Sequence, residues 1–222
     1  MDKVRLIDIK ETILSDNRDI ADEIRAELLK EKVFMLNIMS SPGAGKTTLI
    51  IETLRKMKDK FRFVVIEGDI DSQVDSDKVA AEGVSAIQLR TGGSCHLDAP
   101  MIEEALKNID LSATDVILIE NIGNLVCPAD FDLGQTRKAM FLSVPEGDDK
   151  ALKYPLMFQV SDLLVITKVD YLKHSDFNYK ALEERTEKLN PRLDIIKTSA
   201  KTGEGLEDFC QWLQEEIVKV RT

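Results

Sequence analysis

A glycine-rich turn between an apolar run and an amphipathic segment constrains this chain more than any other feature. The apolar run covers residues 33–39 and reads VFMLNIM, and its length and flanking residues predict a buried strand. The turn follows at residues 40–48 as SSPGAGKTT, and helical spacing begins near Lys46. A strand, a glycine-rich turn and a helix in direct succession aim backbone N–H groups and a helix N-terminus at one point, where they can hold a phosphate.

The turn also matches the pattern G-x-x-x-x-G-K-[ST], except that Ser40 stands at the first glycine position. In this pattern the lysine contacts the β and γ phosphates of a nucleotide, and the following hydroxyl binds magnesium. We therefore predict a P-loop in which Lys46 is catalytic and Thr47 is a magnesium ligand, against the alternative of a plain turn. The predicted nucleotide-binding residues of the loop are Gly43, Ala44, Gly45, Lys46, Thr47 and Thr48.

Apolar runs and amphipathic stretches alternate through the rest of the chain. This alternation predicts an α/β fold of the P-loop NTPase class, with a mainly parallel sheet and helices on both faces. Ligands of such sheets bind at the carboxyl ends of the strands. Further strands are predicted at residues 63–66, 84–87, 116–119, 163–166 and 193–196, and helices from Asp98 to Ile109, at 179–189 and at 206–220.

The beginning of the chain is predicted to be an addition to this fold. Residues 1–32 form a helical extension packed on a single P-loop domain of residues 33–222. Asp16 and Asn17 are residue types that cap helices, and an apolar face that includes Ile24 follows them at helical spacing.

Length, charge and cysteine count narrow the class of protein. A chain of 222 residues suits one domain with a sizeable core, and its net charge of −10 argues against a nucleic-acid-binding surface of clustered lysine and arginine. No apolar run approaches the roughly 20 residues of a membrane span, and the N-terminus lacks a secretory signal. The three cysteines fit a reducing compartment better than a disulfide framework. We expect a cytoplasmic protein that binds neither nucleic acid nor membrane.

Acidic residues follow two of the predicted strands. Asp69 and Asp75 come after the strand at 63–66, and Glu120 comes after the strand at 116–119. Carboxylates at strand ends beside a phosphate loop hold magnesium or its waters, so we predict these three as magnesium-binding and catalytic residues. Asp71 and Asp77 are interpreted as members of a solvated acidic loop.

The sequence after Glu120 resembles a phosphate sensor. Gly123 stands three residues on, as in the D-x-x-G arrangement in which the glycine N–H contacts the γ phosphate, and we include it among the nucleotide-binding residues. Asn124 follows where some GTPases have a water-orienting glutamine. The sequence therefore predicts slow intrinsic hydrolysis.

Two segments after later strands predict guanine as the base. Residues 167–170, TKVD, resemble the N-K-x-D motif, in which the aspartate accepts protons that guanine offers and adenine does not. Residues 199–201, SAK, resemble the loop whose backbone meets the guanine carbonyl. The predicted base-binding residues are Lys168, Asp170, Ser199, Ala200 and Lys201.

A cysteine–histidine cluster is predicted at the same sheet edge. Cys95 and His96 follow the strand at 84–87, and Cys127 lies seven residues beyond Glu120. Thiolate and imidazole suit zinc, copper and nickel, and three ligands leave an open site that can release its metal. The alternative is that the cysteines are small buried hydrophobes. His174 is interpreted as a surface residue and Cys210 as a core residue.

Taken together, these motifs resemble the hydrogenase nickel-incorporation GTPases of the HypB type, from about Val33 to the C-terminus. The resemblance rests on SSPGAGKTT, EGDIDSQVDSDK, LRTGGSCHLDA, ENIGNLVCPA, EGDDKALKYP, TKVD and SAKTGEG, in this order. It implies a GTP-hydrolysing metallochaperone that binds GTP or GDP with Mg²⁺ and handles Ni²⁺ or Zn²⁺ at Cys95, His96 and Cys127. It also implies a homodimer stabilised by GTP and metal, with a maturation accessory protein and the hydrogenase large subunit as partners.

The chain departs from relatives at several points. Only two histidines occur, so a His-rich nickel store is not expected. Ser41 occupies the position of the signature lysine of related ATPases, which leaves Lys150 and Lys153 as candidates for a cation acting across the dimer. An exposed dimer surface is predicted to include Tyr171, Leu172 and Phe177, against the alternative of local packing.

Three other functions stay open at this stage. A small-molecule kinase would share the P-loop but not the two guanine motifs. A urease-type nickel GTPase would carry Cys-Pro-His, whereas residues 127–129 read Cys-Pro-Ala. A metal-binding module with a structural zinc would unfold when a chelator removes the metal.

Overall fold

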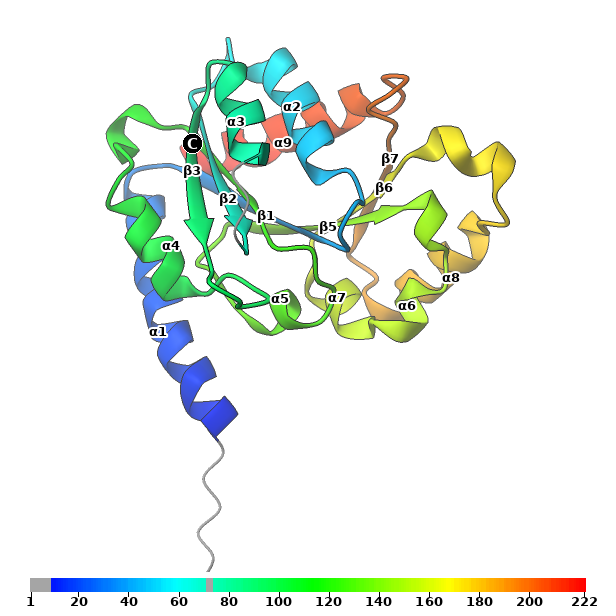
Figure 1. Ribbon diagram of the computed structural model, residues 1–222, viewed down its shortest axis with the longest axis horizontal. Helices are drawn as coiled ribbons and strands as arrows, with labels where there is room; N and C mark the ends of the chain where they lie inside the picture. Colours follow the sequence, from blue (N-terminus) through cyan, green and yellow to red (C-terminus); the bar gives the residue numbers. More distant parts are fainter. Residues whose placement is uncertain (1–8, 71–73) are drawn as a thin grey trace, which may run out of the picture.

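The fold is described from a computed structural model of the protein, which covers residues 9–70 and 74–222 (Figure 1). The strands of this part form one sheet in the order β3-β2-β4-β1-β5-β6-β7, and every neighbouring pair is parallel. This confirms the predicted fold class. The strands are β1 Phe34–Ser40, β2 Phe63–Asp69, β3 Ser85–Arg90, β4 Val116–Glu120, β5 Arg137–Ser143, β6 Leu163–Thr167 and β7 Asp194–Lys197.

Helices cover both faces of the sheet (Figure 1). Helices α2, α3 and α9 lie on one face, and α1, α4 and α5 to α8 lie on the other. The helices are α1 Ile9–Lys30, α2 Lys46–Met57, α3 Val74–Ala81, α4 Ala99–Leu106, α5 Cys127–Asp130, α6 Lys150–Lys153, α7 Pro155–Val160, α8 Tyr179–Leu189 and α9 Leu206–Arg221, with 3₁₀ turns η1 Leu111–Ala113, η2 Val144–Glu146 and η3 Val169–His174.

The central strand β1 is buried on both sides, which explains its continuous apolar sequence. Leu36 and Ile38 pack in the core under α2 and α9, whereas Met35 packs in the core under α1 and α4. Successive side chains of a strand point to opposite faces, so both layers of helices are anchored on the strand that leads into the P-loop.

Strand β5 is missing from the strands predicted by sequence pattern, although it pairs with both β1 and β6. It begins with the charged residues Arg137 and Lys138, so its sequence does not read as one continuous apolar run. Arg137 is paired at the start of the strand, because its Nε lies 2.6 Å from Glu216 Oε2 and its Nη1 lies 3.6 Å from Asp162 Oδ1. The backbone N–H of Lys138 donates to Asp162 Oδ2 over 2.8 Å. The predicted helix after Asp98 also ends at Leu106, before Ile109.

Asn17 does not cap the first helix as predicted, because α1 begins earlier, at Ile9. Asn17 is 4% exposed inside α1, and its side-chain oxygen accepts from Ala99 N over 2.8 Å. Its amide donates to Asp132 O over 2.7 Å. Asn17 therefore binds the first N–H group of α4, whose N-cap is Asp98, and joins α1 to α4 and to the segment before β5.

No helix within residues 9–70 and 74–222 combines the length and the apolar character needed to cross a membrane.

Candidate nucleotide and metal site

The P-loop connects the end of β1 to the start of α2. Gly43 and Gly45 have φ angles of 75° and 98°, which a side chain would strain. Lys46 Nζ lies buried and donates to Ser40 Oγ over 3.0 Å. Burial lowers the pKa of Lys46, and the nearby carboxylate of Glu120 opposes that shift. Ser40, the departure from the glycine pattern, thus supplies an acceptor that orients the lysine.

A cleft of about 520 Å³ opens beside the P-loop. Glu120 Oε1 accepts from Thr47 Oγ1 over 2.9 Å and lies 3.9 Å from Lys46 Nζ. Asp69 and Asp75 also line the cleft. The structure therefore brings the predicted hydroxyl, lysine and carboxylates to one place, with Glu120 as the residue in direct contact with the loop.

Other acidic residues of this region differ in their surroundings. Asp75 Oδ1 pairs with Lys78 Nζ over 2.7 Å, and this lysine lines the same cleft, although the sequence motifs did not indicate it. Asp77 is exposed, in agreement with the expectation of a solvated side chain. Asp71 lies outside the described residues.

Glu67 is the functional candidate that the motifs missed. It lies opposite Glu120 in the pairing of β2 with β4, and it is 3% exposed. Within the described part of the chain, Glu67 Oε1 and Glu120 Oε2 are buried oxygens without a hydrogen-bond partner. Burial, and then the neighbouring Glu120, raise the pKa of Glu67 to about 9, and burial also raises the pKa of Glu120.

Such a pair of buried carboxyl groups fits a divalent cation, because a cation would compensate the charges that burial penalises. A signal for Glu67 was present in the sequence. Phe63 and Val65 share its face of β2, so strand alternation alone directs Glu67 toward α2 and the P-loop.

Gly123 lies against the P-loop itself. A Cβ atom at this position would come within 2.8 Å of Pro42 Cα, so only glycine allows this approach. The backbone of residue 123 thereby borders the phosphate cleft. This position suits the predicted sensing of a γ phosphate by its N–H group.

A second cavity, of about 210 Å³, holds the predicted base-binding residues. Thr167 Oγ1 donates to Ala44 O over 2.6 Å, and Lys168 Nζ donates to Gly43 O over 2.7 Å. Ser199 Oγ donates to Asp170 Oδ1 over 2.7 Å. The lining residues are Ala44, Gly45, Thr48, Leu49, Thr167, Lys168, Asp170, Tyr171, Thr198, Ser199, Ala200 and Lys201.

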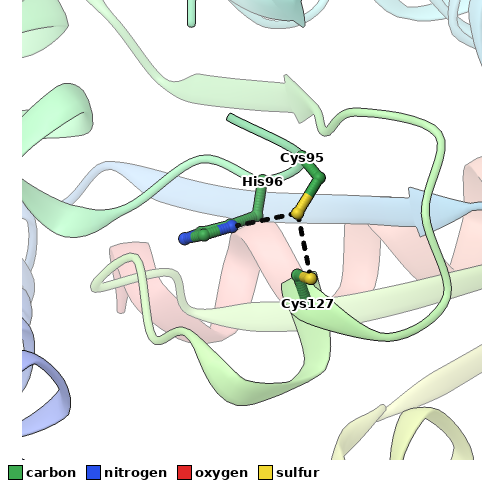
Figure 2. A group of neighbouring side chains, drawn as sticks. All are labelled: Cys95, His96 and Cys127. Atoms are coloured by element: carbon green, nitrogen blue, oxygen red, sulfur yellow. Dashed lines mark hydrogen bonds between the residues drawn. The ribbon is translucent and has the colours of Figure 1, made fainter. Parts of the chain in front are cut away.

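Cys95, His96 and Cys127 come together at the same edge of the sheet (Figure 2). Their candidate ligand atoms all lie within 4.8 Å of one another, and they form the metal-type cluster found among the described residues. Cys95 Sγ is 3.0 Å from Cys127 Sγ and 3.7 Å from His96 Nδ1. Cys95 and His96 lie between β3 and α4, whereas Cys127 begins α5.

The histidine ring is held by an aromatic neighbour that the motifs did not indicate. The rings of His96 and Phe131 stack with centroids 3.9 Å apart. Burial lowers the pKa of His96, which favours the neutral imidazole that binds metals. The contact with Cys95 raises the pKa of Cys127, so a bound cation would be needed to favour its thiolate.

The remaining sequence-based expectations have mixed outcomes. Cys210 is buried and His174 is exposed, as expected. Tyr171 is 48% exposed, but Leu172 and Phe177 are half-buried and pack on the core between β6 and α8, so the predicted exposed surface is wrong for these two.

The candidate trans-acting lysines lie on α6. Lys153 Nζ pairs with Asp149 Oδ2 over 2.5 Å, and Lys150 Nζ lies 5.6 Å from the centroid of the Tyr154 ring. Neither lines the phosphate cleft of its own chain.

Comparison with known proteins gives one consistent family. The family model described as the CobW/HypB/UreG nucleotide-binding domain matches residues 34–197. The chain is 44% identical over 214 residues to the hydrogenase maturation factor HypB of Rhizobium leguminosarum bv. viciae, covering 96% of this chain and 72% of the relative. It is 45% identical over 214 residues to the hydrogenase/urease maturation factor HypB of Helicobacter pylori strain J99, covering 95% of this chain and 88% of the relative.

Solved structures agree with the sequence relatives. The crystal structure of HypB from Helicobacter pylori in complex with nickel matches with a TM-score of 0.87 and 43% identity, over 92% of this chain and 96% of that one. The crystal structure of the hydrogenase maturation factor HypB from Archaeoglobus fulgidus matches with a TM-score of 0.86 and 37% identity, over 91% of this chain and 99% of that one.

Proposed function

The chain belongs to the CobW/HypB/UreG family of nucleotide-binding proteins, as a member of its HypB type, and from this premise we propose that it is a GTP-hydrolysing metallochaperone that handles nickel for the maturation of [NiFe]-hydrogenase. The observation that carries the proposal is the continuity of residues 120–127: this segment starts at the phosphate cleft with Glu120 and ends at the metal cluster with Cys127.

Recognition of guanine is supported by the second cavity. Asp170 lies there with its carboxylate fixed by the Ser199 hydroxyl, and a carboxylate accepts hydrogen bonds from the N1 and N2 protons of guanine. Adenine would leave this acceptor unpaired in a partly buried cavity, which is costly. Lys168 spans from the base cavity to the P-loop carbonyl of Gly43, so base and phosphate sites are connected.

Hydrolysis is assigned to the phosphate cleft. In this proposal Lys46 neutralises the β and γ phosphates, supported by its hydrogen bond to Ser40 Oγ, which orients it. Thr47, Asp69, Asp75 and Glu120 would hold Mg²⁺, which supplies charge stabilisation to the transferred phosphoryl group. Asn124 stands where some GTPases have a water-orienting glutamine, and its amide is bonded to Cys95 O and Val126 N, so we propose slow intrinsic hydrolysis in the isolated protein.

Nickel is the proposed cargo. The Cys95, His96 and Cys127 side chains supply two sulfurs and one nitrogen, a donor set that suits Ni²⁺ and also Zn²⁺. Cys95 is exposed and three side chains leave the coordination shell incomplete, so further ligands would come from water or from a second copy of the chain. A GTP- and metal-stabilised homodimer, a maturation accessory protein and the hydrogenase large subunit are the proposed partners, in a cytoplasmic setting.

A urease role is the second candidate, because the Helicobacter pylori relative is named a hydrogenase/urease maturation factor. The chemistry at this chain would be the same, and only the final acceptor would differ. A kinase is disfavoured because the base cavity carries both guanine-type segments next to the P-loop.

The test is a matched comparison of GTP and ATP, each with Mg²⁺, in binding and in phosphate release, for the wild type and for Lys46→Ala. The proposal predicts GTP bound at least about a hundredfold more tightly than ATP and hydrolysed to GDP, with hydrolysis lost in the variant. Equal use of the two nucleotides, or hydrolysis that survives loss of Lys46, would contradict it. Nickel binding is measured on the same samples by titration with NiSO₄.

A further inference from the structure

We infer that Asn124 is the positioning residue through which the bound nucleotide sets the geometry of the nickel site, an inference that rests on the proposed function. Asn124 supplies no metal ligand and does not line the phosphate cleft, although its side-chain amide also interacts with the Cys127 thiol. Its backbone follows the glycine that borders the cleft, and its side chain bonds to both segments that carry the cysteines.

The nucleotide end of this connection is tightly packed. Gly123 lies so close to the P-loop that a Cβ atom would come within 2.8 Å of Pro42 Cα. A shift of residue 123 toward a γ phosphate is therefore constrained by the loop that binds the phosphate. Because Asn124 shares the next peptide unit, the same shift displaces the Asn124 side chain.

At the metal end, one amide group makes two hydrogen bonds to backbone groups. Asn124 Nδ2 donates to Cys95 O over 3.2 Å, and Asn124 Oδ1 accepts from Val126 N over 2.9 Å. The first bond holds the backbone of one ligand residue, and the second holds the residue before Cys127. Asn124 therefore joins two loops that are 32 residues apart in sequence at the point where Cys95 Sγ meets Cys127 Sγ.

The side-chain amide of Asn121 holds the other end of the Cys95–His96 loop in place. Asn121 is 1% exposed, and its Oδ1 accepts from Leu97 N over 3.3 Å and from Ile122 N over 2.9 Å. Its Nδ2 donates to Asn37 Oδ1 in β1 over 3.1 Å. The far end of the Cys95–His96 loop is thus anchored to the buried sheet, whereas its near end is held by the half-exposed Asn124.

This arrangement predicts that the bound nucleotide changes the metal affinity through Asn124, and not only that Asn124 stabilises the two loops. One anchored end and one end tied to the phosphate-sensing turn allow Cys95 to move relative to Cys127 when the turn responds to nucleotide. A hydrogen bond made in one nucleotide state and lost in the other changes metal affinity by about five- to tenfold. Removing the Asn124 side chain should remove that difference while leaving all three ligands in place.

The experiment measures Ni²⁺ affinity by titration with NiSO₄, once with Mg²⁺ and GDP and once with Mg²⁺ and a non-hydrolysable GTP analogue. The readout is the ratio of the two dissociation constants, followed through sulfur-to-nickel charge-transfer absorption. Asn124→Ala removes both hydrogen bonds. Asn124→Asp keeps the acceptor for Val126 N but cannot donate to Cys95 O, and it serves as the second variant if the first fails to fold. Asn108→Ala, at an exposed amide just beyond the C-terminal end of α4, is the matched control.

We expect the wild type and Asn108→Ala to show a ratio of at least about five, and both Asn124 variants to show a ratio within about twofold of one. An unchanged ratio in the Asn124 variants, or equal weakening in both nucleotide states, would overturn the inference and make Asn124 a structural support. A wild-type ratio near one would also overturn it, while GTP hydrolysis and nickel binding on the same samples would show whether the proposed function itself survives.

Discussion

Glu67 and Glu120 face each other on adjacent parallel strands, and each keeps one buried carboxylate oxygen without a hydrogen-bond partner. Burying two acidic groups side by side is unfavourable unless they share a proton, as the raised pKa of Glu67 indicates, or a cation joins them. This local destabilisation of the nucleotide-free protein is consistent with a cleft built to receive Mg²⁺ and phosphates, and it makes the pair the most direct probe of the proposed catalytic site.

Replacing Glu67 by Gln should stabilise the protein in the absence of nucleotide and metal. The folded protein raises the pKa of Glu67 from 4.5 to about 9, so the unfolded state ionises first and wild-type stability falls as pH rises between those values. The Gln variant has no ionisable group at this position, so its stability does not fall with pH for this reason. We expect no difference below pH 4.5 and a gain of about 1 kcal/mol near neutral pH, measured by urea unfolding with a chelator present.

The same variant should bind Mg²⁺ more weakly in the nucleotide complex, because one carboxylate of the proposed cation environment is gone. Glu103→Gln, on the exposed side of α4, is the control for loss of a negative charge. A stability difference that is independent of pH, or an unchanged magnesium requirement, would show that Glu67 is ordinary core.

Replacing Asp170 by Asn should change base preference. The variant exchanges an acceptor for a group that can also donate, which suits the 2-oxo group of xanthine and leaves guanine poorly paired. GTP affinity should fall about a hundredfold and XTP affinity should rise, by titration of each nucleotide. Asp208→Asn, at an exposed position in α9, should leave both affinities unchanged. If the Asp170 variant still binds GTP tightly, the base must be recognised by other residues.

Replacing Cys127 by Ser should lower Ni²⁺ affinity by at least about tenfold, because a poor ligand replaces a thiolate. Cys210→Ala should keep nickel stoichiometry, because Cys210 packs in the core away from the cluster, although the protein should lose stability by about 1 kcal/mol. Equal nickel loss in the two variants would point to a general effect of cysteine removal.

Chelation distinguishes cargo from structural metal. Cys95 and His96 lie on the loop between β3 and α4, and Cys127 is the first residue of α5; none of the three belongs to the hydrophobic core clusters of the described residues. We therefore expect a chelator to remove nickel with a change in Tm of no more than a few degrees, measured by thermal unfolding followed by circular dichroism. Unfolding at ordinary temperature on chelation would instead support a structural zinc.

Much of the fold was predictable because the signals were local. The strand, glycine turn and helix around Lys46 lie within one stretch of sequence, and the apolar runs of β1, β4 and β6 are buried on both faces. Strand β5 was not predicted because charged residues begin it, and Glu216 and Asp162, which pair with Arg137, lie farther along the chain. Sequence pattern does not show such long-range compensation.

Some residues of the site were likewise predictable from the sequence and others were not. Cys95, His96 and Cys127 could be placed at one sheet edge because each follows a predicted strand. Glu67 was overlooked because its importance depends on its register against Glu120. Asn124 was noticed only as the residue that replaces a glutamine, since its two hydrogen bonds appear only when the loops are folded together.

The central claim is that one segment, residues 120–127, connects GTP to the metal. The measurement that tests it most directly is the Ni²⁺ affinity of the wild-type protein with Mg²⁺ and GDP, compared with Mg²⁺ and a non-hydrolysable GTP analogue. A difference of about tenfold, equal to about 1.4 kcal/mol of coupling, is the predicted result. Equal affinities in the two nucleotide states would contradict the account, because the nucleotide site and the metal site would then be independent.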